Sequence, residues 1–217
     1  MKNYFDYIKN RIDDMFRPVL SDRNIMEYNK KGILIETPIK DEQIQPNSVD
    51  LTLGKTWKIL VPNIVKSSGV NYGPNDLIDS REPIKYNEGF FEHGVNGSHY
   101  FTIQPKQFVL MASNEILNIP NGIIAFVQGR SSVARLAIQT EQAGLIDAGF
   151  RGTITFEVFN QSEYPIILYA GTRVAQVYFF KAQSAKILYG EDKGSKYNGQ
   201  IEATGSRIHL DHELQDN

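Results

Sequence analysis

The sequence contains no cysteine among its 217 residues. This excludes disulfide bonds, thiolate metal sites and a cysteine nucleophile. No segment approaches the ~20 continuous apolar residues of a membrane span, and the N-terminal stretch has no apolar run of signal-peptide type. The formal net charge is only −2, so no general field draws the chain toward nucleic acid or anionic membranes. We therefore expect a cytoplasmic protein with no nucleic-acid or membrane partner, in which any polyanion site is local.

Several catalytic signatures are also missing. The sequence has no G-x-S-x-G turn, no Walker A loop and no G-x-G-x-x-G fingerprint. Its four histidines show no metal-ligand spacing with one another or with a carboxylate, and they are His93, His99, His209 and His212. Without cysteine, the His/Cys ligand set of a zinc deaminase cannot be built. A Ser-His-Asp hydrolase and a zinc-dependent deaminase are both disfavoured.

The pattern of apolar residues predicts a mainly β protein. The length favours a single domain, and 41% hydrophobic with 22% charged residues is ordinary for a globular chain. Short apolar or alternating runs follow one another after residue 100, separated by turn residues: YFTIQ, FVLMAS, IIAFVQG, GTITFEVF, PIILYA and TRVAQVYFF. Many short strands at roughly 8–12-residue spacing indicate an all-β sandwich or barrel.

The N-terminal part adds two predicted helices and a strand. Residues 1–17 have apolar residues at helical spacing, ended by Pro18. Ser21 and Asp22 are typical of an N-cap for a second helix over residues 23–31. The alternation of SVDLTLG (48–54) predicts a strand that continues over residues 57–61.

Two further segments are polar and rich in glycine. Residues 62–97 are read as long loops with short strands between them, and a loop of this length is often functional or interfacial. Residues 194–217 form a tail that is either a disordered end or a flap that closes over a ligand.

The turn Gly129-Arg130-Ser131-Ser132, followed by Arg135, is a candidate phosphate site. Guanidinium groups, hydroxyls and backbone N–H groups are the donors that phosphate oxygens favour. If residues 132–138 are helical, the helix N-terminus adds a positive dipole end. The alternative interpretation of these residues is a helix N-cap with two solvated arginines.

Three carboxylates are candidates for chemistry. Glu157 lies in the strand TITFEVF, where strict alternation places it on one face with Thr153 and Thr155. Burial would raise the pKa of its carboxyl and suit it to acid–base work, whereas the commoner case is an exposed Glu. Asp147, in AGLIDAGFRG, fits either a sugar contact or a simple turn. Asp50, in SVDLTLG, carries the same ambiguity.

Taken together, these stretches resemble the dCTP deaminase family of the dUTPase-like superfamily, from Leu20 to Asp211. Most of the chain is covered, and the order of the signatures makes the resemblance specific. The matching stretches are LSDRNI (20–25), IQPNSVDLTLG (44–54), QGRSSVARL (128–136), AGLIDAGFRGTITFEVFN (143–160), AGTRVAQVYF (170–179) and SKYNGQIEATGSRI (195–208).

The resemblance implies a distorted β-barrel core and a homotrimer with active sites shared between subunits. In this reading, residues 1–18 are a helical extension and residues 19–193 are the catalytic barrel, with an insert at 62–97. Residues 194–217 are the flap that closes over the nucleotide. Mg²⁺ is carried by the triphosphate of dCTP, the protein supplies no metal ligand, and zinc has no role.

The resemblance also gives roles to individual residues. Its substrate-binding set is Arg130, Ser131, Ser132, Arg135, Ala143, Asp147, Gln176, Lys196, Tyr197 and Gln200. The Arg130–Ser132 turn and Arg135 hold the triphosphate, with Gln176 nearby. Asp147 takes the deoxyribose 3′-hydroxyl, and Ala143 lies against the base. From the flap, Lys196, Tyr197 and Gln200 close over the phosphates and the base. Glu157 is the catalytic carboxylate, and Arg135, Ser131 and Asp147 complete the catalytic set.

The turn AGLIDAGF favours members of the family that also cleave the triphosphate to dUMP and diphosphate. Many single-activity deaminases have a His-Arg version of this turn, and its absence leaves room for a water near the α-phosphate. Two departures count against a close match. Gln142 stands where many members have Thr, and the segment between Arg135 and Ile146 is one residue shorter than in some.

Alternatives in other classes stay open at this point. They are a deaminase that stops at dUTP, a plain dUTPase, and a nucleotide-dependent regulatory protein on the same fold. Glu157 and the tail KYNGQIEATGSRI favour a deaminase over a dUTPase. The resemblance also raises dUTP as a second substrate and dTTP as an inhibitor, which the sequence itself leaves undecided.

Overall fold

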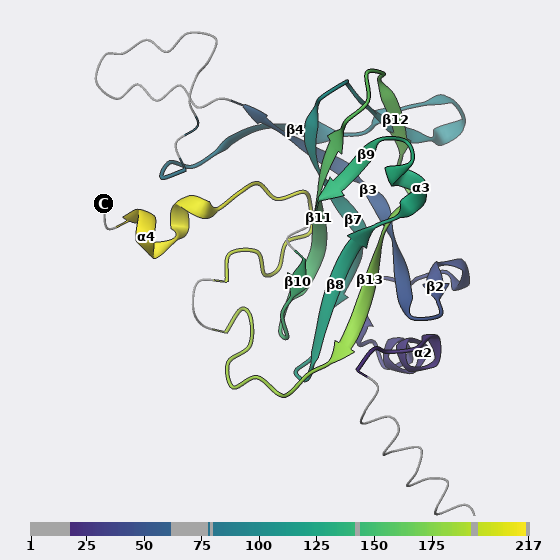
Figure 1. Cartoon of the computed structure of the whole chain (residues 1–217), viewed down its shortest axis with the longest axis vertical. Helices are drawn as coiled ribbons and strands as arrows, with labels where there is room; N and C mark the ends of the chain where they lie inside the picture. Colours follow the sequence, from purple (N-terminus) through teal and green to yellow (C-terminus); the bar gives the residue numbers. More distant parts are fainter. Residues whose placement is uncertain (1–17, 62–77, 79, 142–143, 192–194, 216–217) are drawn as a thin grey trace, which may run out of the picture.

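The computed structural model describes residues 18–61, 78, 80–141, 144–191 and 195–215 (Figure 1). The helix predicted before Pro18, most of the predicted insert, and Gln142 and Ala143 lie outside the described residues. Within the described part, no helix is long and apolar enough to cross a membrane.

The described chain is built mainly from strands. The strands are β1 (Leu34–Ile35), β2 (Ile44–Gln45), β3 (Ser48–Val61), β4 (Lys85–Phe90), β5 (Glu92–His93), β6 (His99–Ile103), β7 (Phe108–Asn118), β8 (Ile123–Gly129), β9 (Ile138–Glu141), β10 (Leu145–Ile146), β11 (Arg151–Asn160), β12 (Ile166–Tyr169) and β13 (Arg173–Lys181). The helices are α2 (Asp22–Lys30), α3 (Ser131–Ala134) and α4 (His212–Gln215), with 3₁₀ turns at η1 (Asp41–Gln43), η2 (Val95–Gly97) and η3 (Ile208–Leu210).

One large sheet curls around the core. Its strand order is β10-β8-β13-β3-β7-β11-β9, with β1, β2 and β4 paired at the sides, and every pairing is antiparallel. A smaller sheet has the order β12-β6-β5. The curled sheet confirms the predicted β-barrel class, and the long strand β3 confirms the strand predicted from residue 48 to residue 61.

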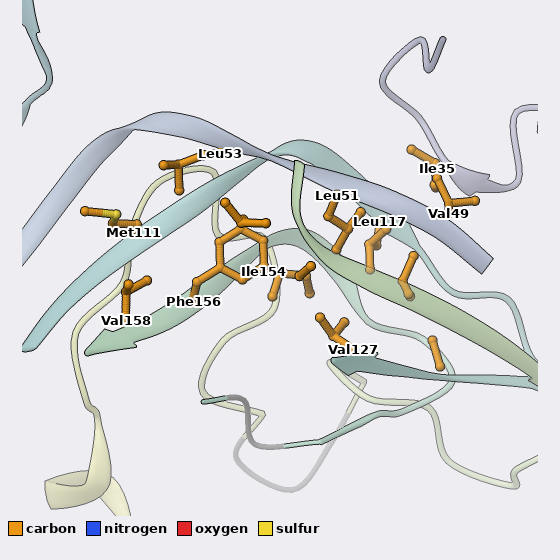
Figure 2. Packing of buried hydrophobic residues seen from close by; sticks show 14 of the residues in the cluster. Ile35, Val49, Leu51, Leu53, Met111, Leu117, Val127, Ile154, Phe156 and Val158 are labelled. Carbon is orange, nitrogen blue, oxygen red and sulfur yellow. The ribbon is translucent and has the colours of Figure 1, made fainter. Parts of the chain in front are cut away.

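The core lies inside this curl. Figure 2 shows Leu51 and Leu53 of β3 facing Met111 of β7 and Phe156 of β11, with Val127 of β8 closing the other side. Four of these five side chains have no exposed surface, and Val127 is nearly buried. Each fully buried side chain of this size stabilises the fold by about 1.5–3 kcal/mol. This packing fixes the face of β11 that is left for chemistry.

The helices α2 and α3 differ in how well they match the prediction. Ser21 caps α2 by accepting a hydrogen bond from the backbone N–H of Asn24, as predicted. α3 is shorter than the helix expected over residues 132–138, because it ends at Ala134. Ala137 turns into the left-handed region with φ of 59°. That turn starts β9 with the buried Ile138 in the core, which a longer helix would prevent.

The C-terminal segment, residues 195–215, lies along the sheet. The backbone N–H of Thr153 donates to the carbonyl of Gln200 at 2.9 Å, and Nε2 of Gln200 donates to the carbonyl of Thr153 at 2.7 Å. Gly152 permits this close approach, because a Cβ there would lie 2.7 Å from the Gln200 carbonyl oxygen. The described residues 195–215 are therefore packed on the sheet, and closure of this segment over a ligand stays a prediction.

Candidate functional site

A cavity of about 420 Å³ opens between β10, β11, the end of β8 and the C-terminal segment. Its lining mixes apolar side chains with a few polar groups, as small-molecule sites do. The lining residues are Tyr86, Phe108, Leu110, Val127, Gly144, Leu145, Ile146, Asp147, Phe150, Ile154, Thr155, Glu157, Tyr189, Tyr197, Gln200, Thr204, Gly205 and Ser206. Four predicted site residues therefore meet here, namely Asp147, Glu157, Tyr197 and Gln200.

Glu157 is half-buried in the middle of β11 and lines the cavity. Its neighbours Phe156 and Val158 are buried in the core, so the strand holds the carboxylate on the cavity side. The predicted strict alternation fails nearby, because the register with β7 shifts between Thr153 and Thr155. As a result Ile154 and Thr155 both line the cavity, while Thr153 is buried under the C-terminal segment.

Asp147 lies at the cavity rim in the turn between β10 and β11. Gly149 shapes this turn with φ of 96°, a conformation that favours glycine. A Cβ at Gly149 would come within 2.8 Å of the backbone of Tyr189. The turn therefore packs tightly on residues 188–189, which fixes where the Asp147 carboxylate lies.

Gln200 presents an unsatisfied acceptor. Its Nε2 is used by the Thr153 carbonyl, whereas its Oε1 is buried without a hydrogen-bond partner among the described residues. Because Gln200 lines the cavity, a donor group on a ligand could satisfy that oxygen. Lys196 is placed differently, since it does not line the cavity and its Nζ lies 2.6 Å from the carboxylate of Asp211.

The predicted phosphate turn lies elsewhere in the same chain. None of Arg130, Ser131, Ser132 and Arg135 is among the described residues that line the cavity. The turn and α3 follow β8 on the opposite side of the sheet from the C-terminal segment (Figure 1). Ser131, Ser132 and Arg135 are exposed there. One chain thus carries both predicted ends of a site, but the fold does not bring them together.

Arg130 is held by a fully buried carboxylate, Asp50 of β3. Nε of Arg130 lies 3.4 Å from the carboxylate, and its Nη1 donates to the carbonyl of Arg173 at 3.1 Å. Nη1 of Arg173 donates to Asp50 at 3.0 Å, and Nε2 of Gln176 donates at 3.1 Å. Two guanidiniums share one carboxylate, so the group keeps one excess positive charge at the surface, which suits a phosphate.

Sequence reasoning missed Arg173 for a structural reason. Arg173 and Gln176 are three residues apart, which in a regular strand places them on opposite faces. A register shift between Arg173 and Ala175 turns both side chains toward Asp50. The bulge leaves no recognisable sequence signal.

A second buried carboxylate, Glu115 of β7, supports β3 beside Asp50. It accepts hydrogen bonds from the backbone N–H of Thr52 at 2.8 Å and its hydroxyl at 2.6 Å, and from Nε2 of Gln43 at 2.9 Å. The same Nε2 donates to the carbonyl of Asp50 at 2.9 Å. These bonds tie β3, β7 and η1 together beneath the arginines.

The fold and the site together define a mainly β protein with a curled antiparallel sheet and a cavity suited to a small molecule. A solved structure of 2′-deoxycytidine 5′-triphosphate deaminase from Agrobacterium tumefaciens matches with a TM-score of 0.55, covering 76% of this chain and 48% of that chain at 22% identity. At that identity the likeness shows the fold alone.

The family follows from sequence. A family model described as dCTP deaminase-like matches residues 19–182. A relative from Sulfurihydrogenibium sp. is 40% identical over 195 residues, which is 89% of this chain and 98% of that protein. Another from Methanobrevibacter smithii is 36% identical over 201 residues, 91% and 98% of the two chains. Both are named dCTP deaminase, dUMP-forming. The chain belongs to the dCTP deaminase-like family, as its signatures predicted.

Proposed function

We propose that this protein is a hydrolase that deaminates dCTP and also hydrolyses the triphosphate, releasing dUMP and diphosphate in cytoplasmic pyrimidine deoxynucleotide metabolism. The relatives named dUMP-forming support this activity. The observation that carries the proposal is the half-buried Glu157 facing a cavity that Asp147 and Gln200 also line. A nucleoside offers a base for the carboxylate, a sugar hydroxyl for Asp147 and an exocyclic amine for the unsatisfied Gln200 oxygen.

In the deamination step, Glu157 acts as general base and then as general acid. Its carboxylate takes a proton from a water and passes it to N3 of cytosine, which makes C4 a better electrophile, as the water oxygen bonds to C4. The carboxylate then takes the remaining proton from the C4 hydroxyl of the intermediate and gives it to the amino group, so that the C4–N4 bond breaks, ammonia leaves and the C4 carbonyl of uracil forms. Apolar lining residues such as Leu110 and Val127 exclude other water from this site.

The triphosphate is bound by the Arg130 turn and Arg135 of a neighbouring subunit in this proposal. The support is geometric, since the turn of the same chain does not line the cavity that contains Glu157. A homotrimer brings the two ends together, and within it Arg135 and Ser131 also help to orient the water. Magnesium enters as part of the substrate, because guanidinium and hydroxyl groups contact phosphate oxygens without competing for the metal.

The second step is attack of water on the α-phosphorus, which breaks the bond to the diphosphate leaving group. The turn around Asp147 consists of small or apolar residues, with Ala148 and Gly149 next to the carboxylate. This composition leaves room for a water near the α-phosphate. Asp147 holds the 3′-hydroxyl and so fixes the sugar for both steps.

Incubation with dCTP and Mg²⁺, with ammonia, dUTP, dUMP and diphosphate resolved over time, tests the proposal. We expect dUMP and ammonia to appear together without free dUTP. Accumulating dUTP would leave a deaminase that stops after the first step. Hydrolysis of dUTP without ammonia from dCTP would indicate a dUTPase. Nucleotide binding without turnover would indicate a regulatory protein.

Glu157→Gln tests the role of the carboxylate. The amide keeps the size of the side chain but cannot take a proton, so we expect ammonia release to fall by about 10³-fold while dCTP still binds. Glu163→Gln is the matched control, because the Glu163 side chain is 77% exposed and pairs only with Lys106 among the described residues. Deamination that persists in Glu157→Gln would remove Glu157 from the mechanism.

A further inference from the structure

The hairpin formed by β3 and β4 reaches the C-terminal segment. Tyr86 of β4 pairs with Leu60 in this hairpin, which extends from the sheet on the same side as α4 (Figure 1). The hydroxyl of Tyr86 accepts a hydrogen bond from the backbone N–H of Ser206 at 2.9 Å. The edge of the predicted insert therefore contacts the predicted flap.

The ring of Tyr86 lies close to Gly205. A Cβ at Gly205 would come within 2.3 Å of the ring, so a larger residue would have to displace it. Next to it, Ala203 is 2% exposed and packs in a small cluster with Leu110, Ala112 and Tyr86. This cluster is separate from the main core and exists only while the C-terminal segment is in place.

Two hydroxyl groups of the large sheet also bind residues 203–206, the stretch of the C-terminal segment that contacts Tyr86. The backbone N–H of Ala203 donates to Oγ1 of Thr56 at 3.2 Å, and that of Thr204 donates to Oγ1 of Thr155 at 3.1 Å. Thr155 and Tyr86 both hold residues 203–206 and line the cavity, Thr155 from β11 and Tyr86 from the β3–β4 hairpin.

Two further tyrosines connect this stretch to the cavity. The hydroxyl of Tyr197 accepts a hydrogen bond from the backbone N–H of Arg207 at 3.0 Å. The hydroxyl of Tyr189 in turn accepts a hydrogen bond from the backbone N–H of Tyr197 at 3.2 Å. Both rings line the cavity. Displacement of residues 203–206 would therefore move Tyr197, because its hydroxyl is bound to Arg207, the next residue in the chain.

Resting on the proposed function, we infer that Tyr86 is a positioning residue for nucleotide binding. It latches residues 203–206 onto the β3–β4 hairpin, and through them holds Tyr197 and Gln200 against the cavity that takes the pyrimidine nucleotide. The described edge of the 62–97 segment thereby has a function, which is to preorganise the closing contacts made by the C-terminal segment.

Tyr86→Phe removes the hydroxyl and keeps the ring. We expect amide hydrogen exchange at residues 203–207 to quicken by about fivefold in the nucleotide-free protein, as the loss of one hydrogen bond predicts. We expect KM for dCTP to rise by a similar factor with kcat changed less than about twofold, because a preorganised contact is lost before chemistry. Tyr164→Phe is the matched control, since Tyr164 is 75% exposed on the loop before β12.

Gly205→Ala provides the second variant, because its Cβ would displace the Tyr86 ring. Its effect on exchange and on KM should shrink when Tyr86→Ala is added, since the truncated side chain makes room for the methyl group. Unchanged exchange in Tyr86→Phe, or faster exchange with unchanged KM, would overturn the latch. Wild-type protein that releases no ammonia from dCTP would instead overturn the proposed function, while the exchange measurements would still decide whether the latch exists.

Discussion

At the scale of single residues, the arginine group around Asp50 shows how a buried charge can serve an exposed site. Asp50 has no exposed surface, yet it fixes two guanidiniums whose side chains are 25% and 37% exposed. A buried carboxylate is costly unless it is paired and hydrogen-bonded, and here Arg130, Arg173 and Gln176 satisfy it. The arrangement holds two planar donors in fixed positions, which suits the phosphate-binding role proposed for this turn.

Asp50→Asn should weaken both stability and triphosphate binding. The amide leaves the two guanidiniums uncompensated, so we expect the free energy of unfolding to fall by about 3 kcal/mol, the low end for breaking a buried pair. Inhibition by inorganic tripolyphosphate should weaken by about tenfold, because Arg130 loses its anchor. Urea denaturation and inhibition assays measure the two effects, with the exposed Asp41→Asn as control. Stability equal to that of the control would refute this account of Asp50.

Residue types alone left both ends of the predicted site undecided, because each end also fitted a plain structural role. Glu157 and Asp147 were identified from their sequence context, and the structure brings them to one cavity. Arg173 was missed because the bulge in β13 breaks the two-residue period on which strand reasoning depends. Tyr86 was missed because its contact with Ser206 joins segments far apart in the chain. The residue roles taken from the family resemblance stay predictions.

At the scale of elements, long uniform strands were predictable and short elements were not. β3 follows directly from its apolar residues, and its ends agree with the prediction. α3 could not be bounded from sequence, because its end is set by the need to bury Ile138 against β11. The strand β4 gave only a weak pattern, since most of its residues are exposed and Tyr86 packs against the C-terminal segment instead of the main core.

The hairpin of β5 and β6 carries a pair of histidines, one of which has a lowered pKa. His93 and His99 are partners across the two strands, with ring centroids 4.6 Å apart. Partial desolvation, then the charges of Lys55 and His93, lower the pKa of His99 below its ordinary value of 6.5. Because the folded-state pKa is lowered, the unfolded state binds the proton more readily.

The stability contributed by His99 is therefore fully present above pH 6.5 and is lost as the pH falls through the folded-state pKa. Urea denaturation between pH 5 and 8 should show stability rising with pH, and His99→Gln should make this rise shallower. His212→Gln, at an exposed position of α4, is the control. An NMR titration midpoint for His99 above 6.5 would contradict the prediction.

At the scale of the whole molecule, the separation of Glu157 from Arg135 makes the proposed trimer testable by mixing. Arg135→Ala and Glu157→Gln should each be inactive alone. After joint unfolding and refolding in equal amounts, a site needs an intact Glu157 from one subunit and an intact Arg135 from its neighbour. Random assembly gives about one quarter of wild-type activity. If refolded wild-type protein is active and the mixture is not, the shared site is wrong.

The place of β13 between β8 and β3 also governs how the chain can fold during synthesis. Val49 of β3 pairs with Val177 of β13, and more than half of the chain lies between them. This edge of β3 therefore stays unpaired until that part of the chain has been synthesised. At ribosomal rates of about 5–20 residues per second, that wait is on the order of ten seconds. Throughout it an apolar strand edge is open to pairing with other nascent chains. Soluble yield should therefore depend on the speed of translation and on chaperone supply, even where the finished fold is stable.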